Sequence, residues 1–285
     1  MLRQRLLTAA VGIPLLAVVL LLGQPWLAVL LALLVLGAAI ELARLMRQAG
    51  FESVPVLTAV LALAGAAALA FGDVAGGDVV LSDGRLALAW LALVVVAAAS
   101  AAIILPIPAA GLRRFAATVS GALALAMLGF LLRIALEAGT ESAAGQLVEL
   151  LDPGRAWLLA VVLAVWAYDS AAYATGRLWG RRRFFAHISP HKTWSGAAGG
   201  SGGAIAGALL LGLLLGRPAE GAGLGLVVAL VAPVGDLAES MLKRAAGAKD
   251  SGGFFPGHGG VLDRVDSFLA VAPAAWLYLE VVGVL

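Results

Sequence analysis

Acidic and basic side chains gather near the end of one long apolar run. One face of a helix, by its i+3, i+4 and i+7 spacing, would carry Asp236, Glu239, Ser240 and Lys243. An acid within a membrane span is costly and usually faces a cavity or a binding site, so Asp236 is a candidate functional carboxylate. The alternative is an Asp–Lys pair at the membrane surface, with the long lysine side chain reaching water.

A glycine-rich stretch follows and leads into a second acidic segment, His258-Gly-Gly-Val-Leu-Asp263-Arg264-Val-Asp266. Mg²⁺ takes oxygen ligands and often binds through one or two carboxylates together with substrate phosphates, a role that suits Asp236 and Asp263. Acids also favour the first turn of a helix through capping and the helix dipole, which leaves a structural role open for Asp263 and Asp266. A lone histidine such as His258 is more typical of a loop hydrogen bond than of a base or a ligand.

A third group of polar residues surrounds another apolar run. Asp169 lies well inside that run and needs a partner, a metal or a water-filled cavity. After the run, Ser189-Pro-His-Lys192-Thr193 offers an ammonium group and hydroxyls, which suit a phosphate. The combination favours phosphoryl chemistry on an anionic substrate, with Mg²⁺ bridging phosphate oxygens. The alternative is an ion-coupled transporter that uses intramembrane Asp169 and Asp236.

The elements that position these residues are membrane-spanning helices. Hydrophobic residues make up 62% of the chain, charged residues 13%, and the mean hydropathy is +1.02, well above the roughly 45–50% apolar usage of soluble domains. The apolar stretches are continuous, as in spanning helices of about 20 residues, and lack the alternation of a barrel. The sequence predicts an all-α, polytopic integral membrane bundle of about nine spans: 6–23, 25–46, 55–72, 86–106, 115–136, 156–179, 197–216, 222–242 and 265–284.

Basic residues predict the orientation. Most of them fall on one side if the N-terminus is cytoplasmic, and an odd number of spans then places the C-terminus outside. Two longer cytoplasmic loops, 177–196 and 243–266, are basic and rich in glycine. We divide the chain into an N-terminal region 1–140, with about five spans, and a catalytic region 155–285, with about four. The sequence has no cysteine, which excludes disulfides and thiolate metal sites.

The segment 240–266 resembles the signature of the phosphatidate cytidylyltransferase family. The matching elements, in order, are Ser240-x-Leu-Lys-Arg244, Lys249-Asp250, Phe255-Pro-Gly-His258-Gly-Gly and Asp263-Arg-x-Asp266. A second element of the family is similar to Asp169-x-x-Ala-Tyr173, Gly176-Arg177 and Ser189-Pro-x-Lys192-Thr193-Trp194. In the N-terminal half, the resemblance is limited to hydropathy and Glu41-Leu-Ala-Arg-Leu.

The resemblance implies a Mg²⁺-dependent nucleotidyltransferase that makes CDP-diacylglycerol and pyrophosphate from CTP and phosphatidic acid, in phospholipid biosynthesis. The implied metal ligands are Asp236 and Asp263, and the implied catalytic residues are Asp236, Asp263, Lys243, Arg264 and Asp266. The residues implied to bind CTP and phosphate are Asp169, Ser189, Lys192, Thr193, Ser240, Arg244, Lys249, Asp250, His258, Gly259 and Gly260. The family usually continues Lys-Thr-x-Glu-Gly, whereas this chain has Ser195, so no role of that Glu is carried over.

The resemblance also implies a location and partners. We expect a multi-pass protein of the cytoplasmic (inner) membrane with its active site facing the cytoplasm. Its partners would be CTP, phosphatidic acid and membrane lipid, without nucleic acid, and the resemblance is compatible with a second cation and a homodimer. A CDP-alcohol phosphotransferase, another Mg²⁺-dependent lipid enzyme, is disfavoured because its Asp-Gly pair followed by spaced Asp residues is absent from the sequence.

Overall fold

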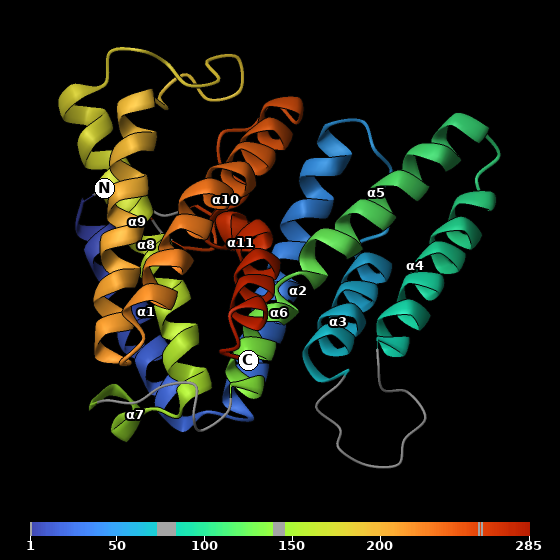
Figure 1. Ribbon diagram of the computed structural model, residues 1–285. Helices are drawn as coiled ribbons and strands as arrows, with labels where there is room; N and C mark the ends of the chain where they lie inside the picture. Colours follow the sequence, from blue (N-terminus) through green and yellow to red (C-terminus); the bar gives the residue numbers. More distant parts are fainter. Residues whose placement is uncertain (1, 73–83, 139–145, 256, 258) are drawn as a thin grey trace. The chain divides into compact units, whose positions relative to one another are not determined.

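The computed structural model describes residues 2–72, 84–138, 146–255, 257 and 259–285 (Figure 1). Within these residues every regular element is an α-helix, and extended pairing is limited to the bridges Arg183–Thr193 and Phe255–Gly259. Helices suit continuous apolar sequence because in lipid a helix satisfies its backbone groups internally. The helices are α1 Leu2–Leu22, α2 Trp26–Gln48, α3 Pro55–Phe71, α4 Arg85–Ile103, α5 Pro108–Ala126, α6 Gly129–Glu137, α7 Gln146–Leu150, α8 Pro153–Trp179, α9 Trp194–Leu214, α10 Pro218–Ala245 and α11 Leu262–Val281.

Six described helical stretches are long and apolar enough to cross a membrane. They are α2, α4, the stretch Pro108–Glu137 that contains α5 and α6, α8, α9 and α10. Two apolar helices are shorter, Ala10–Leu22 within α1 and Pro55–Phe71, which is α3. The last predicted span corresponds to α11, which carries Asp263, Arg264, Asp266 and Glu280. The polytopic all-α fold is confirmed, and the number of nine spans stays a prediction.

The chain folds into two compact units. The first contains Met1–Arg133 and Leu242–Val265, and the second contains Ile134–Met241 and Asp266–Leu285. The unit boundaries fall inside α10 and α11, so each of these helices contributes residues to both units. The segment Leu242–Val265, which the sequence assigns to the catalytic region, thus packs with the N-terminal helices. The assignment of catalysis to region 155–285 stays a prediction.

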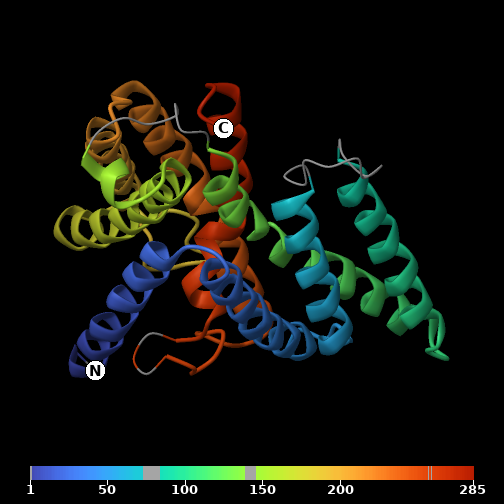
Figure 2. The same cartoon turned by 90° about the horizontal axis from the view of Figure 1, so that it is seen from below.

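The core of the first unit forms where α3, α4 and α5 pack side by side (Figure 2). The buried side chains of Leu61, Trp90, Val94 and Ala122 belong to one apolar cluster. The Trp90 indole Nε1–H donates a hydrogen bond of 2.7 Å to the Leu61 carbonyl oxygen, so the ring's polar group is satisfied inside the core. Gly65 leaves the room that this ring occupies, because a Cβ there would overlap the indole.

Close packing of α8 against α9 organises the second unit (Figure 1). Glycines of α9 face α8 along the contact: a Cβ at Gly199 would overlap Thr175, and one at Gly203 would overlap Ala171. Small residues of this kind let helix backbones approach closely in membranes, where packing rather than the hydrophobic effect drives association. The two helices therefore form a firm support for the loop that joins them.

The two predicted loops are shorter than the sequence indicates. α8 continues to Trp179 and α9 begins at Trp194, which leaves 180–193 as the connection. α10 continues to Ala245 and α11 begins at Leu262, which leaves 246–261. The basic residues Arg177, Lys243 and Arg244 therefore lie in the last turns of helices, where cations are stabilised by the helix dipole.

Candidate functional site

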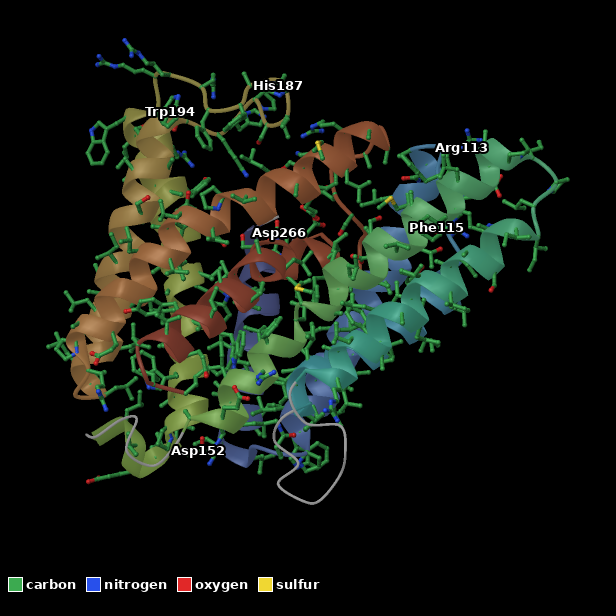
Figure 3. All side chains as sticks on the ribbon, turned by 45° about the vertical axis from the view of Figure 1, so that its right-hand side comes forward. Arg113, Phe115, Asp152, His187, Trp194 and Asp266 are labelled. Atoms are coloured by element: carbon green, nitrogen blue, oxygen red, sulfur yellow. The ribbon has the colours of Figure 1, made fainter. Side chains whose placement is uncertain are left out.

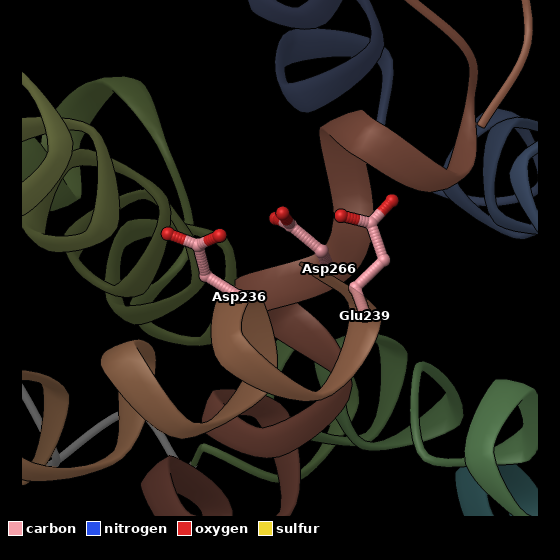
Figure 4. A group of neighbouring side chains, drawn as sticks. All are labelled: Asp236, Glu239 and Asp266. Carbon is pink, nitrogen blue, oxygen red and sulfur yellow. The ribbon is translucent and has the colours of Figure 1, made fainter. Parts of the chain in front are cut away.

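Three carboxylates of the second unit form an acidic group, Asp236, Glu239 and Asp266. One carboxylate oxygen of each lies within 4.8 Å of the others. Figure 4 shows that Asp236 and Glu239 come from one helix and Asp266 from another, with all three carboxylates on the same side. Glu239 is buried, and the other two are partly exposed. Such a concentration of negative charge suits a hard cation that takes oxygen ligands.

The local sequence explains how these acids meet. Asp236 and Glu239 are three residues apart on α10, so they share a face of that helix. Gly235 lets the α10 backbone approach α11 closely, because a Cβ there would overlap the carbonyl oxygen of Asp266. The N–H of Ser267 donates a 2.6 Å hydrogen bond to Asp266 Oδ1. The acidic group is thus held by helix packing as well as by sequence spacing.

A lysine from the loop before α9 pairs with this acidic group. Lys192 Nζ lies 2.5 Å from Asp236 Oδ2, in an ion pair that is partly exposed. The adjacent Thr193 caps α9, where its Oγ1 accepts a 3.1 Å hydrogen bond from the N–H of Gly196 and lies 3.2 Å from the Ser195 hydroxyl. Figure 3 shows Trp194 at the start of α9 and His187 in the loop before it. Because Lys192 directly precedes Thr193, this cap fixes the backbone from which the Lys192 side chain reaches the acidic group.

Replacing Lys192 by Met is expected to tighten the binding of a divalent cation to the acidic group. The ammonium group neutralises Asp236, and a cation that binds there has to displace it. Loss of this partly exposed charge is worth about 1 kcal/mol, or roughly fivefold in Kd for Mn²⁺. Isothermal titration of the purified protein with Mn²⁺ measures the change. The control is Arg217→Met, which removes the Arg217–Glu220 ion pair in the same unit and should leave Kd for Mn²⁺ unchanged. If Kd were also unchanged in Lys192→Met, that result would contradict cation binding by the acidic group.

The first unit contains a second set of contacts, the loop cluster, around Asp263. Lys243 Nζ donates to Asp263 Oδ1 at 2.7 Å, in an ion pair that is nearly buried. Oδ2 accepts hydrogen bonds from the N–H of Ser251 at 2.9 Å and from the N–H of Gly260 at 2.8 Å, and it lies 2.8 Å from the Ser251 hydroxyl oxygen. Both oxygens of this carboxylate are therefore engaged, one by a cation and one by the loop 246–261.

These contacts determine the charge state of Asp263. Burial raises the pKa of its carboxyl, but the hydrogen bond and charge of Lys243, with the N–H groups of Gly260 and Ser251, outweigh burial and hold the pKa below its usual value. The carboxylate is ionised at neutral pH and stays so in moderately acidic solution. Asp263 can therefore hold the Lys243 ammonium in one place throughout the physiological pH range.

The other predicted site residues occupy varied environments. Ser240 is buried, and its hydroxyl lies 3.5 Å from Asp236 Oδ1. Arg244 donates to the carbonyl oxygen of Ala248 at 3.3 Å, and Gly259, at φ +81°, accepts from the N–H of Phe255 at 2.9 Å. Ser189 is partly buried and accepts from the N–H of Lys192 at 3.3 Å. Five residues are exposed, Asp169, Arg244, Lys249, Asp250 and Arg264, and His258 lies outside the described residues.

The structure groups the acids differently from the predicted metal pair. Among the described residues, the acidic group contains Asp236 with Glu239 and Asp266, while Asp263 belongs to the loop cluster. The part of Asp263 in metal binding stays a prediction. The sequence prediction did not include Glu239 in the site, although its spacing from Asp236 was the available signal.

Two further residues of the loop cluster also escaped the sequence prediction. Ser251 follows Lys249-Asp250 directly but has no distinctive pattern of its own. Glu41 is an acid inside an apolar run and begins the short N-terminal stretch that resembles the family, and these were the two available signals. Its Oε2 lies 2.9 Å from the Ser251 hydroxyl. The contacts of Ser251 with Glu41 and with Asp263 cannot be predicted from local spacing, because the partners lie far apart in the sequence.

Comparison with known proteins gives one family match and several similar proteins. A profile described as the cytidylyltransferase family matches residues 3–282. A protein of Brucella suis named phosphatidate cytidylyltransferase is 52% identical over 118 residues, which are 40% of this chain and 43% of that protein. Proteins of the same name from Synechocystis and Mycobacterium bovis are 44% identical over 128 residues and 42% identical over 130 residues, covering 43% and 45% of this chain and 43% and 42% of theirs. In each pair, the chain spans less than half the length of the relative it matches.

Proposed function

We propose that this chain, which belongs to the cytidylyltransferase family, transfers the cytidylyl group of CTP to phosphatidic acid. The products would be CDP-diacylglycerol and pyrophosphate. The observation that carries the proposal is the acidic group, three carboxylates with oxygens within 4.8 Å of one another in a multi-pass membrane protein. The printed name of the three relatives supports the choice of substrates. All three are named as enzymes, so an ion-coupled transporter has no support among them.

The proposed reaction needs no strong base. A phosphate oxygen of phosphatidic acid, already anionic, would attack the α-phosphorus of CTP, and the bond from that phosphorus to the oxygen bridging the β-phosphate would break. Pyrophosphate leaves with that electron pair. Because the nucleophile and the leaving group are both anionic, catalysis rests on alignment of the two phosphates and on stabilisation of negative charge.

The acidic group fits a divalent cation, and we propose Mg²⁺. Asp236, Glu239 and Asp266 offer carboxylate oxygens, the ligands that Mg²⁺ prefers, and leave other positions for water and substrate phosphate. When bound, such a cation would offset negative charge on phosphate oxygens. Asp263, also predicted as a ligand, would serve through its contact with Lys243.

Basic residues would bind the phosphates of CTP and of the lipid. We propose that Lys243, held by Asp263 at 2.7 Å, stabilises the charge that develops on the leaving pyrophosphate. Lys192 would move from Asp236 to phosphate when a cation occupies the acidic group. The exposed side chains of Arg264, Arg244 and Lys249 would attract the polyanionic nucleotide from solution.

A membrane protein suits this reaction because its two substrates come from different phases. The acyl chains of phosphatidic acid stay in lipid, whereas CTP is dissolved in water. We propose that the protein lies in the cytoplasmic membrane with a cytoplasmic N-terminus and a site that faces the cytoplasm, as the distribution of basic residues predicts. A homodimer remains part of this proposal.

The experiment is an assay of pyrophosphate release by the purified protein in detergent micelles. With Mg²⁺, CTP and phosphatidic acid, we expect release that requires both substrates. Diacylglycerol, which lacks the nucleophilic phosphate, and ATP in place of CTP should give none. Release that is independent of the lipid would identify a nucleotide hydrolase and reject the proposed transfer.

A further inference from the structure

A buried glutamate of the N-terminal half contacts the loop cluster. Glu41 lies on α2, a candidate membrane span, and is only 9% exposed. Its Oε2 accepts the Ser251 hydroxyl at 2.9 Å and the N–H of Leu262 at 2.8 Å. All of these residues belong to the first unit. Burying an acid in an apolar helix costs free energy, so such a residue usually has a function.

Two glycines of the loop 246–261 lie against this carboxylate. A Cβ at Gly252 would overlap Glu41 Oε1, and a Cβ at Gly260 would overlap Oε2. One turn earlier on α2, a Cβ at Gly37 would come within 2.9 Å of the Val261 side chain. The contact surface on α2 is thus shaped to accept both ends of the segment 251–262, with the carboxylate of Glu41 at its centre.

Glu41 also caps α11. The first N–H groups of a helix have no partner within the helix and are usually satisfied by a nearby side chain. Here the N–H of Leu262 donates to Glu41, and the N–H of Asp263 donates to the Ser251 hydroxyl at 3.2 Å. A negative charge at this end is also favoured by the helix dipole. The side chain that caps the helix therefore comes from another helix, more than two hundred residues earlier in the sequence.

The Ser251 hydroxyl connects the two carboxylates. Its Oγ lies 2.9 Å from Glu41 Oε2 and 2.8 Å from Asp263 Oδ2. Asp263 in turn accepts from Lys243 at 2.7 Å. The contacts run without a break from a buried residue of α2 to the ammonium group of α10.

We propose that Glu41 is a positioning residue, which holds Ser251 and the start of α11 and, through Ser251 and Asp263, fixes the Lys243 ammonium for catalysis. The inference rests on the proposed function, because it gives Glu41 a part in the same reaction. It extends the machinery from the segment 240–266 into the N-terminal half of the chain. Glu41 would not touch either substrate.

Replacing Glu41 by Ala is expected to lower kcat for CDP-diacylglycerol formation about 10²-fold, the effect of misplacing a catalytic group by roughly 1 Å. KM for phosphatidic acid should change little, since Glu41 does not contact the lipid. Glu41→Gln keeps an oxygen that can accept both hydrogen bonds and should restore most of kcat. Rates are measured on purified protein with labelled CTP, and thermal unfolding of each variant is followed in parallel.

Ser251→Ala tests the same connection without altering α2. We expect a fall in kcat similar to that of Glu41→Ala, and the double variant should be no worse than either single one, because both act through one set of contacts. If Glu41→Ala does not yield folded protein, Ser251→Ala alone tests whether these contacts position Lys243. Controls are Glu52→Ala, which removes a carboxylate that pairs with Arg114 at 3.1 Å, and Ser53→Ala, whose hydroxyl donates to Ala43; both should keep full activity.

The outcomes separate this inference from the proposed function. Wild-type protein that forms no lipid-linked cytidine would reject the proposed function itself. Active wild-type protein with unchanged kcat in Ser251→Ala or in folded Glu41→Ala would overturn the role of Glu41 alone. The role of Glu41 would also be overturned if Glu41→Gln did not restore kcat and the losses of kcat in Glu41→Ala and Ser251→Ala added up in the double variant. Glu41 and Ser251 would then have separate structural roles.

Discussion

Replacing Asp236 by Asn is expected to lower the rate of CDP-diacylglycerol formation about 10³-fold, as expected when charge stabilisation at a reacting phosphate is lost. The substitution keeps the size of the side chain and removes its negative charge. The acidic group would retain Glu239 and Asp266, and Lys192 would lose the carboxylate that it contacts at 2.5 Å. Two functions would fail together, the binding of a divalent cation and the placement of Lys192.

The measurement combines activity with binding of Mn²⁺ to the same preparation. In Asp236→Asn we expect both to be lost. Asp152→Asn is a matched control in the second unit: Asp152 caps α8 by accepting from the N–H of Arg155 at 2.8 Å, and Asn can do the same. Asp152 is labelled in Figure 3. Activity within a few fold of wild type in Asp236→Asn would remove the acidic group from the reaction.

Asp263→Asn is expected to lower activity by a similar factor, about 10³-fold, for a different reason. The nearly buried Lys243 would lose its charged partner, and the N–H groups of Ser251 and Gly260 would no longer meet a carboxylate. A lysine without its partner loses its fixed position and becomes easier to deprotonate. The leaving pyrophosphate would then lack the cation that we assign to it.

Binding of Mn²⁺ distinguishes the two substitutions. The loop cluster engages both oxygens of Asp263, so we expect Asp263→Asn to bind Mn²⁺ nearly as wild type does while activity is lost. Loss of Mn²⁺ binding would instead make Asp263 a metal ligand, as the sequence predicts. Full activity in Asp263→Asn would contradict both the placement of Lys243 by Asp263 and a role of Asp263 as a metal ligand. The control is Glu52→Gln, which removes another carboxylate of the first unit.

The helices were largely predictable from the sequence because each apolar run is long and its polar breaks are distinct. Some ends were less so. α8 ends at Trp179, as the predicted span 156–179 does, but α10 continues past the predicted end at 242, through Lys243 and Arg244 to Ala245. Basic residues lower the hydropathy at that point but do not end the helix. Hydropathy detects where lipid contact stops, whereas backbone hydrogen bonding continues into the polar residues.

The site was predictable where it depends on helical spacing. The pairing of Asp236 with Glu239 follows from i+3 spacing, and the acids at the start of α11 follow from their position after glycines. The sequence prediction chose Asp263 as the partner of Asp236, but spacing alone does not decide between Asp263 and Asp266, since both lie in the first turns of α11 and long-range packing determines which one joins Asp236 and Glu239. The contact at Gly235 that brings Asp266 into the acidic group has no local signature.

Contacts between distant segments were out of reach. Glu41 and Ser251 are separated by 210 residues, and no periodicity connects them. Lys192 could be assigned to phosphate from its neighbours, but not to Asp236, because the loop 180–193 has no regular structure that would fix its direction. Sequence patterns predict faces of single elements, whereas the acidic group and the loop cluster each form where several elements of one unit meet.

The fate of the label from CTP tests the proposed transfer most directly. Purified protein is incubated with Mg²⁺, phosphatidic acid and CTP labelled with ³²P at either the α- or the γ-phosphate, and the lipids are extracted and identified by mass spectrometry. We predict that α-label enters a lipid with the mass of CDP-diacylglycerol and that γ-label stays in water as pyrophosphate. Label from the γ-phosphate in the lipid, or no labelled lipid under any divalent metal, would contradict cytidylyl transfer to phosphatidic acid.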